Sequence, residues 1–379
     1  MLKKTIILLF ITGVFFSCSS PTPPTRYAQI TSSYIPKYAQ FFRIDYYENY
    51  KRITVLNPWG NNSLNLEYLI SQDSSAKLVH QSTYSFDLKG SAKTVAALSS
   101  PVVGILNMLK LRSTIKGITD PDLIYDSIIG AELNSGKIEN IGKSIQLNME
   151  KLIMLHPDII IGSGWDQMSA DYKKMIKLKM IPVLMYDWQE VHPLGKAEWM
   201  VFLSAFFNKE ENAQKMFQEI EKQYLSIKNS VKNINKPQVF NGSEYQGIWY
   251  SAGGKSYISK LYRDAGAQYI MENDSSQGST QLDFEVLMQK AAQTPIWMYT
   301  GSIDPIALAL LQTPKYQVFD AVKNHRIYSY HKRINSHGAN DYWETGGLRP
   351  DLVLKDLVEI FHQTDETELD LYYFDEVVY

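Results

Sequence analysis

The order of apolar and polar positions divides this chain into segments with different periods. From Phe41 to about Leu88 apolar and polar residues alternate, as in Arg52–Leu56, and this period of two predicts a small antiparallel β element at the edge of the first lobe. From Thr94 onward, short β-branched runs are each followed by a helical stretch, a pattern typical of parallel α/β construction. The predicted fold class is therefore α/β with an additional β element near the N-terminus.

The expected elements alternate regularly on both sides of residue 209. The predicted strands are Thr94–Leu98, Ile115–Ile118, Ile159–Ile161, Pro182–Tyr186, Gln238–Phe240, Ile296–Tyr299 and Ile327–Tyr330. The predicted helices are Val102–Leu109, Asn148–Leu155, Ala170–Lys177, Tyr257–Ala265, Asp283–Lys290, Pro305–Leu311, Gln317–Val322 and Pro350–His362.

One long helix is predicted between these two halves. Lys209–Asn233 contains neither Gly nor Pro, and its apolar residues recur every three or four positions on one stripe. At about 1.5 Å per residue it would be roughly 37 Å long, which is enough to join two lobes as a strut. We expect two Rossmann-like lobes joined by this backbone helix.

The first residues predict export. Lys3 and Lys4 precede an apolar run from Ile6 to Phe16, which is far shorter than the roughly 20 residues needed to cross a bilayer, and Cys18 follows. Cys18 is the only cysteine, and its place behind a small residue resembles a bacterial lipobox. We expect a signal peptide and lipidation at Cys18, followed by a Pro-rich tether.

Chain length and net charge limit the number of lobes and the kinds of partner that we expect. About 350 residues are more than one core usually serves, so two lobes are expected. The formal net charge of -2 comes from 38 basic and 40 acidic residues and suggests no nucleic-acid partner. The expected segments are residues 1–18 (signal peptide and lipidated cysteine), 19–40 (tether), 41–90 (β element), 91–208 (first lobe), 209–233 (connecting helix), 234–363 (second lobe) and 364–379 (acidic tail, without an assignment).

Four stretches in the same order carry a family resemblance that covers about Lys93 to His362. They are Asn140–Lys143 with Leu147–Ile161, the long helix, Gly254–Ala267 with Leu282–Leu287, and Pro314–Tyr328, in which His325 stands where glycine is usual. Together they resemble the helical-backbone (class III) periplasmic binding proteins, the iron-siderophore, haem and cobalamin group. The β element has no counterpart in the compact members, and its role stays open.

The resemblance implies a function. It implies a substrate-binding lipoprotein, expected to be monomeric, that captures a metal chelate and delivers it to an ABC permease with its ATPase. A ferric siderophore is the first choice, and haem or cobalamin comes next. Glu150 and Glu285 match the glutamates that this family presents to the permease, although each is also an acid in the first turn of a helix. The expected location is the periplasmic side of the envelope, with the cell surface left open.

The loops that follow the predicted strands are the expected ligand site, because ligands of open α/β sheets lie beyond the carboxyl ends of the strands. An aromatic-walled cleft suits a large flat or chelated ligand. The candidate ligand-binding residues are Ser100, Trp165, Trp188, Tyr245, Trp249, Tyr250, Trp343 and Arg349. Arg349 could instead pair with Glu344, which we slightly prefer.

No resident cofactor, metal site or catalytic residue is predicted. The chain has no Walker-type loop, Gly-x-Ser-x-Gly or His-Glu-x-x-His sequence, and its seven histidines have no zinc-type spacing, although His331 or His337 could ligate a haem iron. Two alternatives stay open: a periplasmic metal-cofactor or chelatase-like enzyme, and a surface lipoprotein whose β element binds a protein partner.

Overall fold

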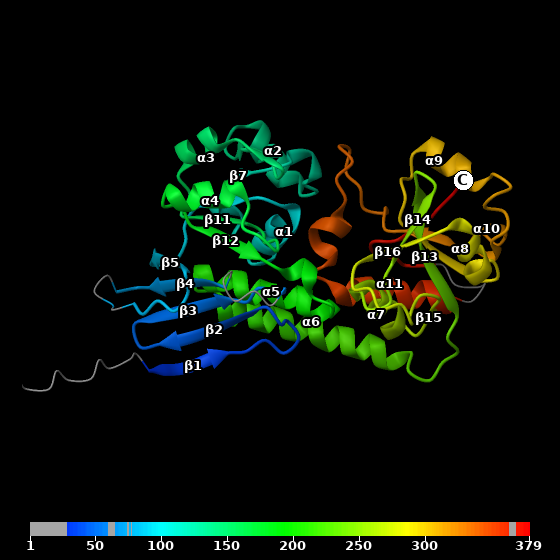
Figure 1. Ribbon diagram of the computed structural model, residues 1–379, viewed down its shortest axis with the longest axis horizontal. Helices are drawn as coiled ribbons and strands as arrows, with labels where there is room; N and C mark the ends of the chain where they lie inside the picture. Colours follow the sequence, from blue (N-terminus) through cyan, green and yellow to red (C-terminus); the bar gives the residue numbers. More distant parts are fainter. Residues whose placement is uncertain (1–28, 60–64, 74–75, 77, 364–368) are drawn as a thin grey trace, which may run out of the picture.

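The computed structural model describes residues 29–59, 65–73, 76, 78–363 and 369–379, and the leader with Cys18 lies outside this range. Two α/β lobes lie side by side over one long helix, and a separate β-sheet covers the outer end of the first lobe (Figure 1). Among the described residues no helix combines the length and the apolar character needed to cross a bilayer.

The N-terminal sheet is larger than the small antiparallel β element that the sequence predicts. Its five strands lie in the order β1-β2-β3-β4-β5, antiparallel except for the parallel pair β4 and β5. They are β1 (Ile30–Tyr34), β2 (Phe42–Tyr47), β3 (Tyr50–Val55), β4 (Leu66–Ser71) and β5 (Tyr84–Lys89). The expected tether of residues 19–40 is therefore wrong from Ile30 on, where the chain already forms β1.

Two contacts attach this sheet to the first lobe. The Tyr68 hydroxyl of β4 donates to Pro182 O (3.0 Å) and accepts from Leu184 N (3.1 Å), so the sheet lies against the edge strand of the lobe, as expected. The buried Glu198 carboxylate accepts the backbone amides of three consecutive residues, Lys37 to Ala39, each at 2.8 Å. These bonds satisfy the buried charge and fix the segment that leads into β2.

The first lobe has a sheet of parallel strands in the order β12-β11-β6-β7-β8. Its strands are β6 (Val95–Ala97), β7 (Ile115–Ile118), β8 (Glu139–Asn140), β11 (Ile159–Ser163) and β12 (Pro182–Met185), and β9 (Gly142–Lys143) pairs with β10 (Gln146–Leu147) beside it. Its helices are α1 (Ser100–Met108), α2 (Ser127–Asn134), α3 (Met149–Leu155) and α4 (Ala170–Lys177). The crossovers are those of the predicted βαβ construction.

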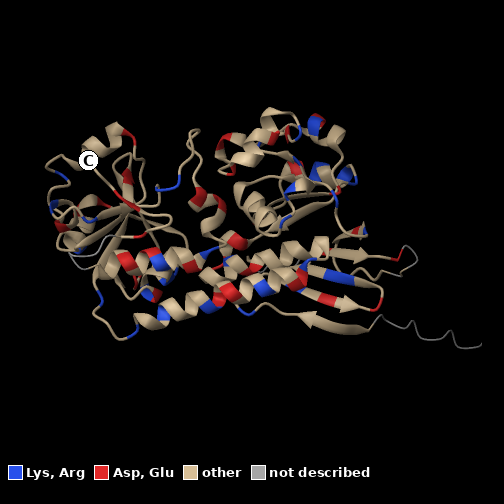
Figure 2. Ribbon diagram, turned by 180° about the vertical axis from the view of Figure 1, so that it is seen from behind, with Lys and Arg blue, Asp and Glu red and all other residues tan. Residues whose placement is uncertain are grey.

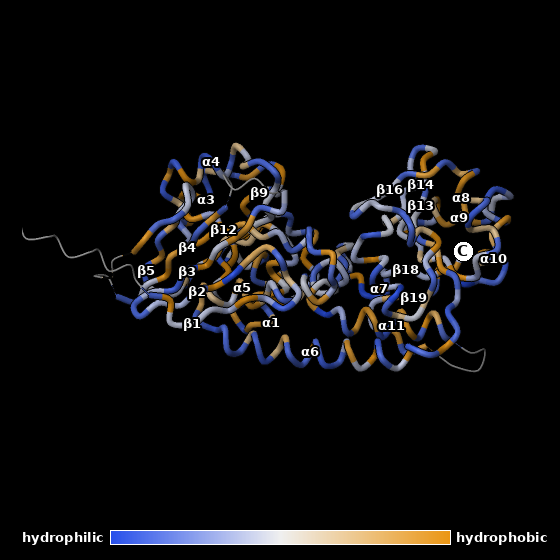
Figure 3. Tube along the Cα trace, turned by 60° about the horizontal axis from the view of Figure 1, so that its bottom comes forward, coloured by the Kyte–Doolittle hydropathy of each residue, from blue (hydrophilic) through white to orange (hydrophobic). Residues whose placement is uncertain are grey.

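The connection between the lobes consists of α5 (Pro193–Ser204), which is buried almost throughout, and α6 (Glu210–Ser230). The long helix α6 contacts both α5 and α11 (Pro350–His362) of the second lobe. Acidic and basic residues are interspersed along α6, and hydrophilic positions follow its outer side (Figures 2 and 3). The Tyr224 hydroxyl donates to Asp264 Oδ2 (2.8 Å), which ties α6 to the second lobe.

The second lobe has a mixed sheet in the order β16-β14-β13-β17-β18-β19, and β15 also pairs with β13, in parallel register. Its strands are β13 (Gln238–Tyr245), β14 (Ile248–Ala252), β15 (Gln268–Tyr269), β16 (Ser279–Leu282), β17 (Ile296–Tyr299), β18 (Ile327–Ser329) and β19 (Asp375–Glu376). Besides α11, its helices are α7 (Tyr257–Asp264), α8 (Phe284–Ala291), α9 (Pro305–Leu311) and α10 (Asp320–Lys323).

The described part of the tail belongs to this lobe. The Asp356 carboxylate, which is fully buried on α11, accepts the amides of Tyr372 (2.8 Å), Tyr373 (2.6 Å) and Phe374 (3.2 Å). Beyond them β19 pairs with β18 in antiparallel register. Residues 369–379 therefore complete the second lobe, although no local pattern predicted a structure for them.

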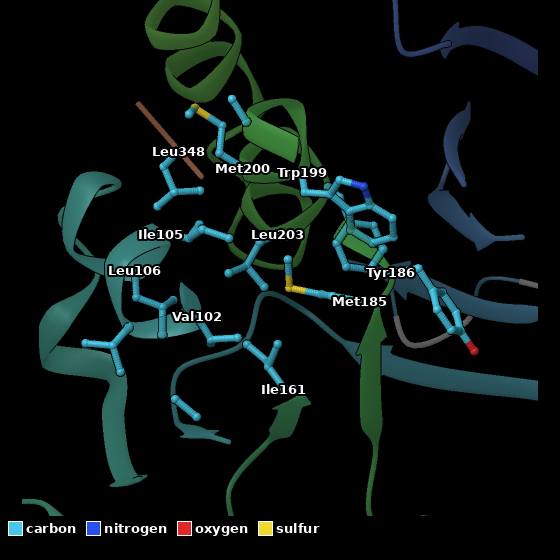
Figure 4. Close-up of a cluster of buried hydrophobic side chains, with 14 of the residues drawn as sticks. Val102, Ile105, Leu106, Ile161, Met185, Tyr186, Trp199, Met200, Leu203 and Leu348 are labelled. Carbon is cyan, nitrogen blue, oxygen red and sulfur yellow. The ribbon is translucent and has the colours of Figure 1, made fainter. Parts of the chain in front are cut away.

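A segment of the second lobe crosses to the first. It contains η6 (Tyr342–Gly346), a π-helical turn that packs on α1. The approach is so close that a Cβ on Gly104 would lie 2.3 Å from Glu344 O, so only glycine fits there. Just beyond, Leu348 enters the apolar cluster of the first lobe beside Ile105 and Met200 (Figure 4). One apolar cluster therefore extends across both lobes, and a second cluster lies within the second lobe.

Candidate functional site

Two adjoining pockets lie between the lobes. The first-lobe pocket has a volume of about 230 Å³ and the second-lobe pocket about 360 Å³. Both are lined by the same six residues, Trp188, Tyr257, Leu261, Tyr342, Trp343 and Val353. Because they share these walls, we treat the two pockets as one interlobe cleft.

The first-lobe wall of the cleft lies at the carboxyl ends of the parallel strands, where the sequence predicts the ligand site. Ser99, Ser163 and Trp188 line the cleft, and each follows or ends a parallel strand, β6, β11 and β12 respectively. The carboxyl ends of these neighbouring strands meet at one edge of the sheet, which is the usual ligand position in open α/β sheets.

Trp188 and Trp343 contribute to both pockets, one from each lobe. Trp188 Nε1 donates to Gly164 O (3.1 Å), which fixes its indole to the first lobe. The Trp343 ring is held edge-on against Tyr330 (5.2 Å between centroids) and Tyr342 (5.4 Å), yet 55% of the residue remains exposed. The cleft thus presents large aromatic surfaces that are already oriented before a ligand arrives.

The second-lobe wall is rich in tyrosine hydroxyls. Burial raises the pKa of Tyr330 to about 12, with Tyr257 and Tyr299 adding to the shift, and burial also raises the pKa of Tyr299. These phenols are therefore neutral at ordinary pH and can donate hydrogen bonds. The wall combines apolar ring faces with a few polar edges, the composition of a small-molecule site.

Few charged groups face the cleft. Lys196 on α5 lies over the Tyr257 ring, 4.3 Å from its centroid. Burial raises the pKa of the nearby Asp187 carboxyl, while Lys196 opposes that shift. Burial also raises the pKa of Glu344 to about 7, against the hydrogen bond that its Oε2 accepts from Tyr125 N (2.7 Å). The arrangement favours a ligand bound mainly by ring faces and hydrogen bonds.

The predicted ligand residues are distributed over several places. Trp188, Tyr250 and Trp343 line the interlobe cleft. Ser100 and Trp165 line an adjoining pocket of about 490 Å³ on the first lobe, which shares Ser99 and Ser163 with the cleft. Arg349 lines a third pocket, of about 470 Å³, between the lobes beside Asp126 and Asp341. Contact of these side chains with a ligand stays a prediction.

The prediction that Trp249 and Tyr245 belong to a ligand-binding loop is wrong, because their segment is a hairpin. Strands β13 and β14 are joined by a tight turn in which Gln246 (φ 52°) and Gly247 (φ 82°) both have positive φ. The alternation of the hairpin turns Trp249 into the core, where it is 1% exposed and donates from Nε1 to Asn241 O. Tyr245 at the tip is 64% exposed and lines none of these four pockets.

Arg349 also differs from the preferred prediction. Its guanidinium binds Asp351 through Nε (2.9 Å) and Nη2 (2.7 Å), and not Glu344. Arg349 and Asp351 lie on either side of Pro350, at the start of α11. Asp351 is therefore closer along the chain to Arg349 than Glu344 is. Glu344 instead bonds to the first lobe.

Sequence reasoning missed several cleft residues. Tyr257 and Leu261 are one turn apart on α7, and Lys196 lies on α5. The spacing of Tyr257 and Leu261 could have predicted a shared helix face, but it could not show which neighbour that face meets.

The two candidate docking glutamates lie in equivalent local settings. Glu150 is exposed in the first turn of α3 in the first lobe, and Glu285 is exposed in the first turn of α8 in the second. Neither carboxylate has an ion-pair partner within the described ranges. Their role toward a permease stays a prediction.

Within the part of the chain that the structure describes, no group of three or more His, Cys, Asp or Glu residues is placed to hold a metal ion. Of the two histidines considered for haem iron, His331 bonds through Nδ1 to the Ser329 hydroxyl, and burial lowers its pKa. His337 is exposed beyond it.

Comparison with known sequences finds one family. Residues 95–334 match the family described as periplasmic binding protein. An uncharacterized lipoprotein of Methanocaldococcus jannaschii is 30% identical over 63% of this chain and 56% of its own length, and a second uncharacterized lipoprotein of that organism is 26% identical over 60% of this chain and 59% of its own. This chain thus spans only about half of these two curated relatives.

Solved structures share the fold at low sequence identity. A periplasmic binding protein from Veillonella parvula has a TM-score of 0.59 and 15% identity, with 83% of this chain and 98% of the other covered. A periplasmic haem-binding protein from Roseiflexus (TM-score 0.53, 16% identity) and a periplasmic vitamin B12-binding protein from Vibrio cholerae (0.52, 14%) cover 72% and 73% of this chain and 98% and 99% of their own. These similarities establish the two-lobed fold.

Proposed function

The chain belongs to the periplasmic binding protein family, and from that premise we propose that it captures a metal chelate in the interlobe cleft and delivers it to an ABC permease. A ferric siderophore is the first cargo to consider, followed by haem and cobalamin. Solved relatives with this fold include haem-binding and vitamin B12-binding proteins.

One observation carries the proposal. Trp188 from the first lobe and Trp343 from the second line the same cleft, with tyrosines between them. Large planar side chains offer area to a flat or chelated ligand at little cost in conformational entropy. Ring faces of this kind suit a metal complex whose outer surface consists of organic groups.

The setting in the cell envelope is part of the proposal. Lipidation of Cys18 would hold the protein at the membrane, and two relatives from Methanocaldococcus jannaschii are named lipoproteins. Glu150 and Glu285 would meet the permease, each from its own lobe. Exposed charges of this type mainly set the rate and orientation of association.

Isothermal titration of the purified chain against hemin, cyanocobalamin, a ferric tris-catecholate and a ferric trihydroxamate tests the proposal. We expect tight one-to-one binding of one complex, weakened at least about tenfold by Trp343→Ala. Tyr245→Ala is the matched control, because this aromatic lies at the exposed hairpin tip, and its affinity should stay within about twofold of wild type. Folded wild-type protein that binds none of the four complexes would refute the chelate cargo.

A further inference from the structure

The N-terminal sheet contacts a wall residue of the interlobe cleft, because Trp59, in the loop between β3 and β4, meets Trp188, although Trp59 itself lines neither of the two described cleft pockets. This loop carries Trp59, which is 44% exposed. The strand that follows it, β4, is attached to the edge strand β12 by the Tyr68 hydroxyl, at Pro182 and Leu184. Trp188 follows β12 by three residues, so the same attachment brings the two tryptophans together.

The contacts of Trp59 are made with aromatic rings. Its ring meets Tyr186 edge-on, with 6.0 Å between centroids and 75° between planes. Tyr186 is 1% exposed, belongs to the apolar cluster drawn in Figure 4, and donates from its hydroxyl to Trp165 O (3.3 Å). A buried, fixed ring of this kind holds Trp59 in one place and leaves part of the Trp59 indole open to solvent.

The second contact joins Trp59 to the cleft. Its centroid lies 5.9 Å from that of Trp188, which in turn lies 4.9 Å from Trp165. Trp188 lines the interlobe cleft, while Trp59 and Trp165 are both substantially exposed on either side of it. Three indoles from three loops thus form one continuous aromatic surface, the tryptophan row, at the first-lobe wall.

We infer that Trp59 is a specificity-determining residue of the binding site: the N-terminal sheet supplies it to extend the tryptophan row, which selects ligands with flat conjugated faces. The inference rests on the proposed function, since it names the ligand groups that the cleft prefers. It also assigns a role in ligand selection to the N-terminal sheet. A row of indoles stacks on porphyrin, corrin or catecholate rings, whereas an aliphatic hydroxamate offers it no ring.

The charge around the row fits this preference. The nearest acidic groups of the same loops are Asp166 and Asp187, and burial raises the pKa of Asp187. Lys196 is the one basic residue among those that line the two described cleft pockets. This charge balance favours porphyrin and corrin complexes over a ferric tris-catecholate, because that complex is a trianion and would need more cations than the described cleft provides.

Three variants of the full chain test the inference with the four complexes named above, each checked for unchanged melting behaviour. Trp59→Ala should weaken binding of complexes with flat conjugated faces about tenfold, and Trp59→Phe should restore most of the affinity. Leu56→Ala removes another exposed apolar side chain of the same loop and should change affinity less than about twofold. Rescue by phenylalanine distinguishes stacking from a general effect on the loop.

The other outcomes separate the two proposals. If Trp59→Ala binds within about twofold of wild type, or if Leu56→Ala weakens binding as much, the inference is wrong and the cargo proposal stands. Wild-type protein that binds only the trihydroxamate would likewise overturn the inference and leave the cargo proposal standing. If the wild type binds none of the complexes, the cargo proposal falls, and this inference falls with it.

Discussion

Glu344 of the second lobe accepts the backbone amide of Tyr125 in the first lobe, with 2.7 Å between Oε2 and N. The Asn335 side chain adds a second crossing bond from its Nδ2 to Ile124 O (3.0 Å). Two polar side chains of one segment thus hold neighbouring residues of the opposite lobe, and burial raises the pKa of the Glu344 carboxyl to about 7.

Stability should therefore depend on pH through Glu344. Its pKa in the folded state is raised above that of an exposed carboxyl, so the stabilisation is complete below about pH 4.5 and is lost as the pH rises through 7. Glu344→Gln keeps an acceptor but carries no charge. We expect its free energy of unfolding, relative to wild type, to improve by about 1–3 kcal/mol between pH 5 and pH 8.

Comparing the variant with wild type at each pH is necessary, because other buried groups titrate as well. The pKa values of Glu190 (about 7) and Asp356 (about 6) are raised by burial and act in the same direction. Burial lowers the pKa of His192 to about 4, so its contribution is lost as the pH falls below about 6.5. Equal differences at pH 5 and pH 8 would contradict a charged Glu344 in the folded protein at pH 8.

Leu348 should contribute strongly to stability although it comes from the opposite lobe. It is 4% exposed among first-lobe side chains, so Leu348→Ala leaves a cavity and should lower the free energy of unfolding by about 2–4 kcal/mol in urea denaturation. Leu310→Ala on α9 is the control, because that side chain is 53% exposed and should cost less than about 0.5 kcal/mol. Similar small losses in both variants would show that the lobes pack independently.

Asp356 should hold the C-terminal residues in place. Asp356→Ala removes the acceptor of three backbone amides and should destabilise the protein by about 3 kcal/mol or more. Hydrogen exchange at Tyr372–Phe374 should rise sharply in this variant. Asp370→Ala, at a carboxylate that is 94% exposed, should leave exchange at those amides unchanged. Protected amides in Asp356→Ala would mean that pairing of β19 alone fixes the tail.

Glu150 and Glu285 should affect delivery and not capture. The double variant Glu150→Gln, Glu285→Gln should reduce uptake of the cargo by cells about fivefold or more, because rim charges guide association with the permease. Binding of the same cargo by the purified variant should match wild type. Glu219→Gln on the exposed side of α6 is the control. Unchanged uptake in the double variant would remove both residues from the docking surface.

Much of the fold was predictable because its signals are local. The bounds of α4, β17, α9 and α11 agree with the predicted ranges, since apolar periodicity and Pro at a helix start depend on neighbouring residues only. The family resemblance from four motifs is confirmed by the match over residues 95–334.

The site was less predictable because it depends on which distant segments meet. Trp188 follows strand β12, whereas Trp249 lies in strand β14. Only the pairing of β13 with β14 decides that Trp249 is buried. The Gln246–Gly247 turn between alternating residues was the local signal that could have predicted that hairpin. No local signal marks Glu198 as the acceptor for residues near position 38, since these partners lie 160 residues apart.

The bonds that the buried Glu198 carboxylate accepts from the N-terminal segment also constrain the order of folding. Its four bonds, from the Tyr34 hydroxyl and the amides of Lys37 to Ala39, each close a loop of about 160 residues, and closing so long a loop is entropically costly before other contacts exist. Helix α5 and the first-lobe sheet must therefore be in place before the N-terminal segment can dock. During synthesis this segment is therefore made before α5 but docks only after α5 has formed.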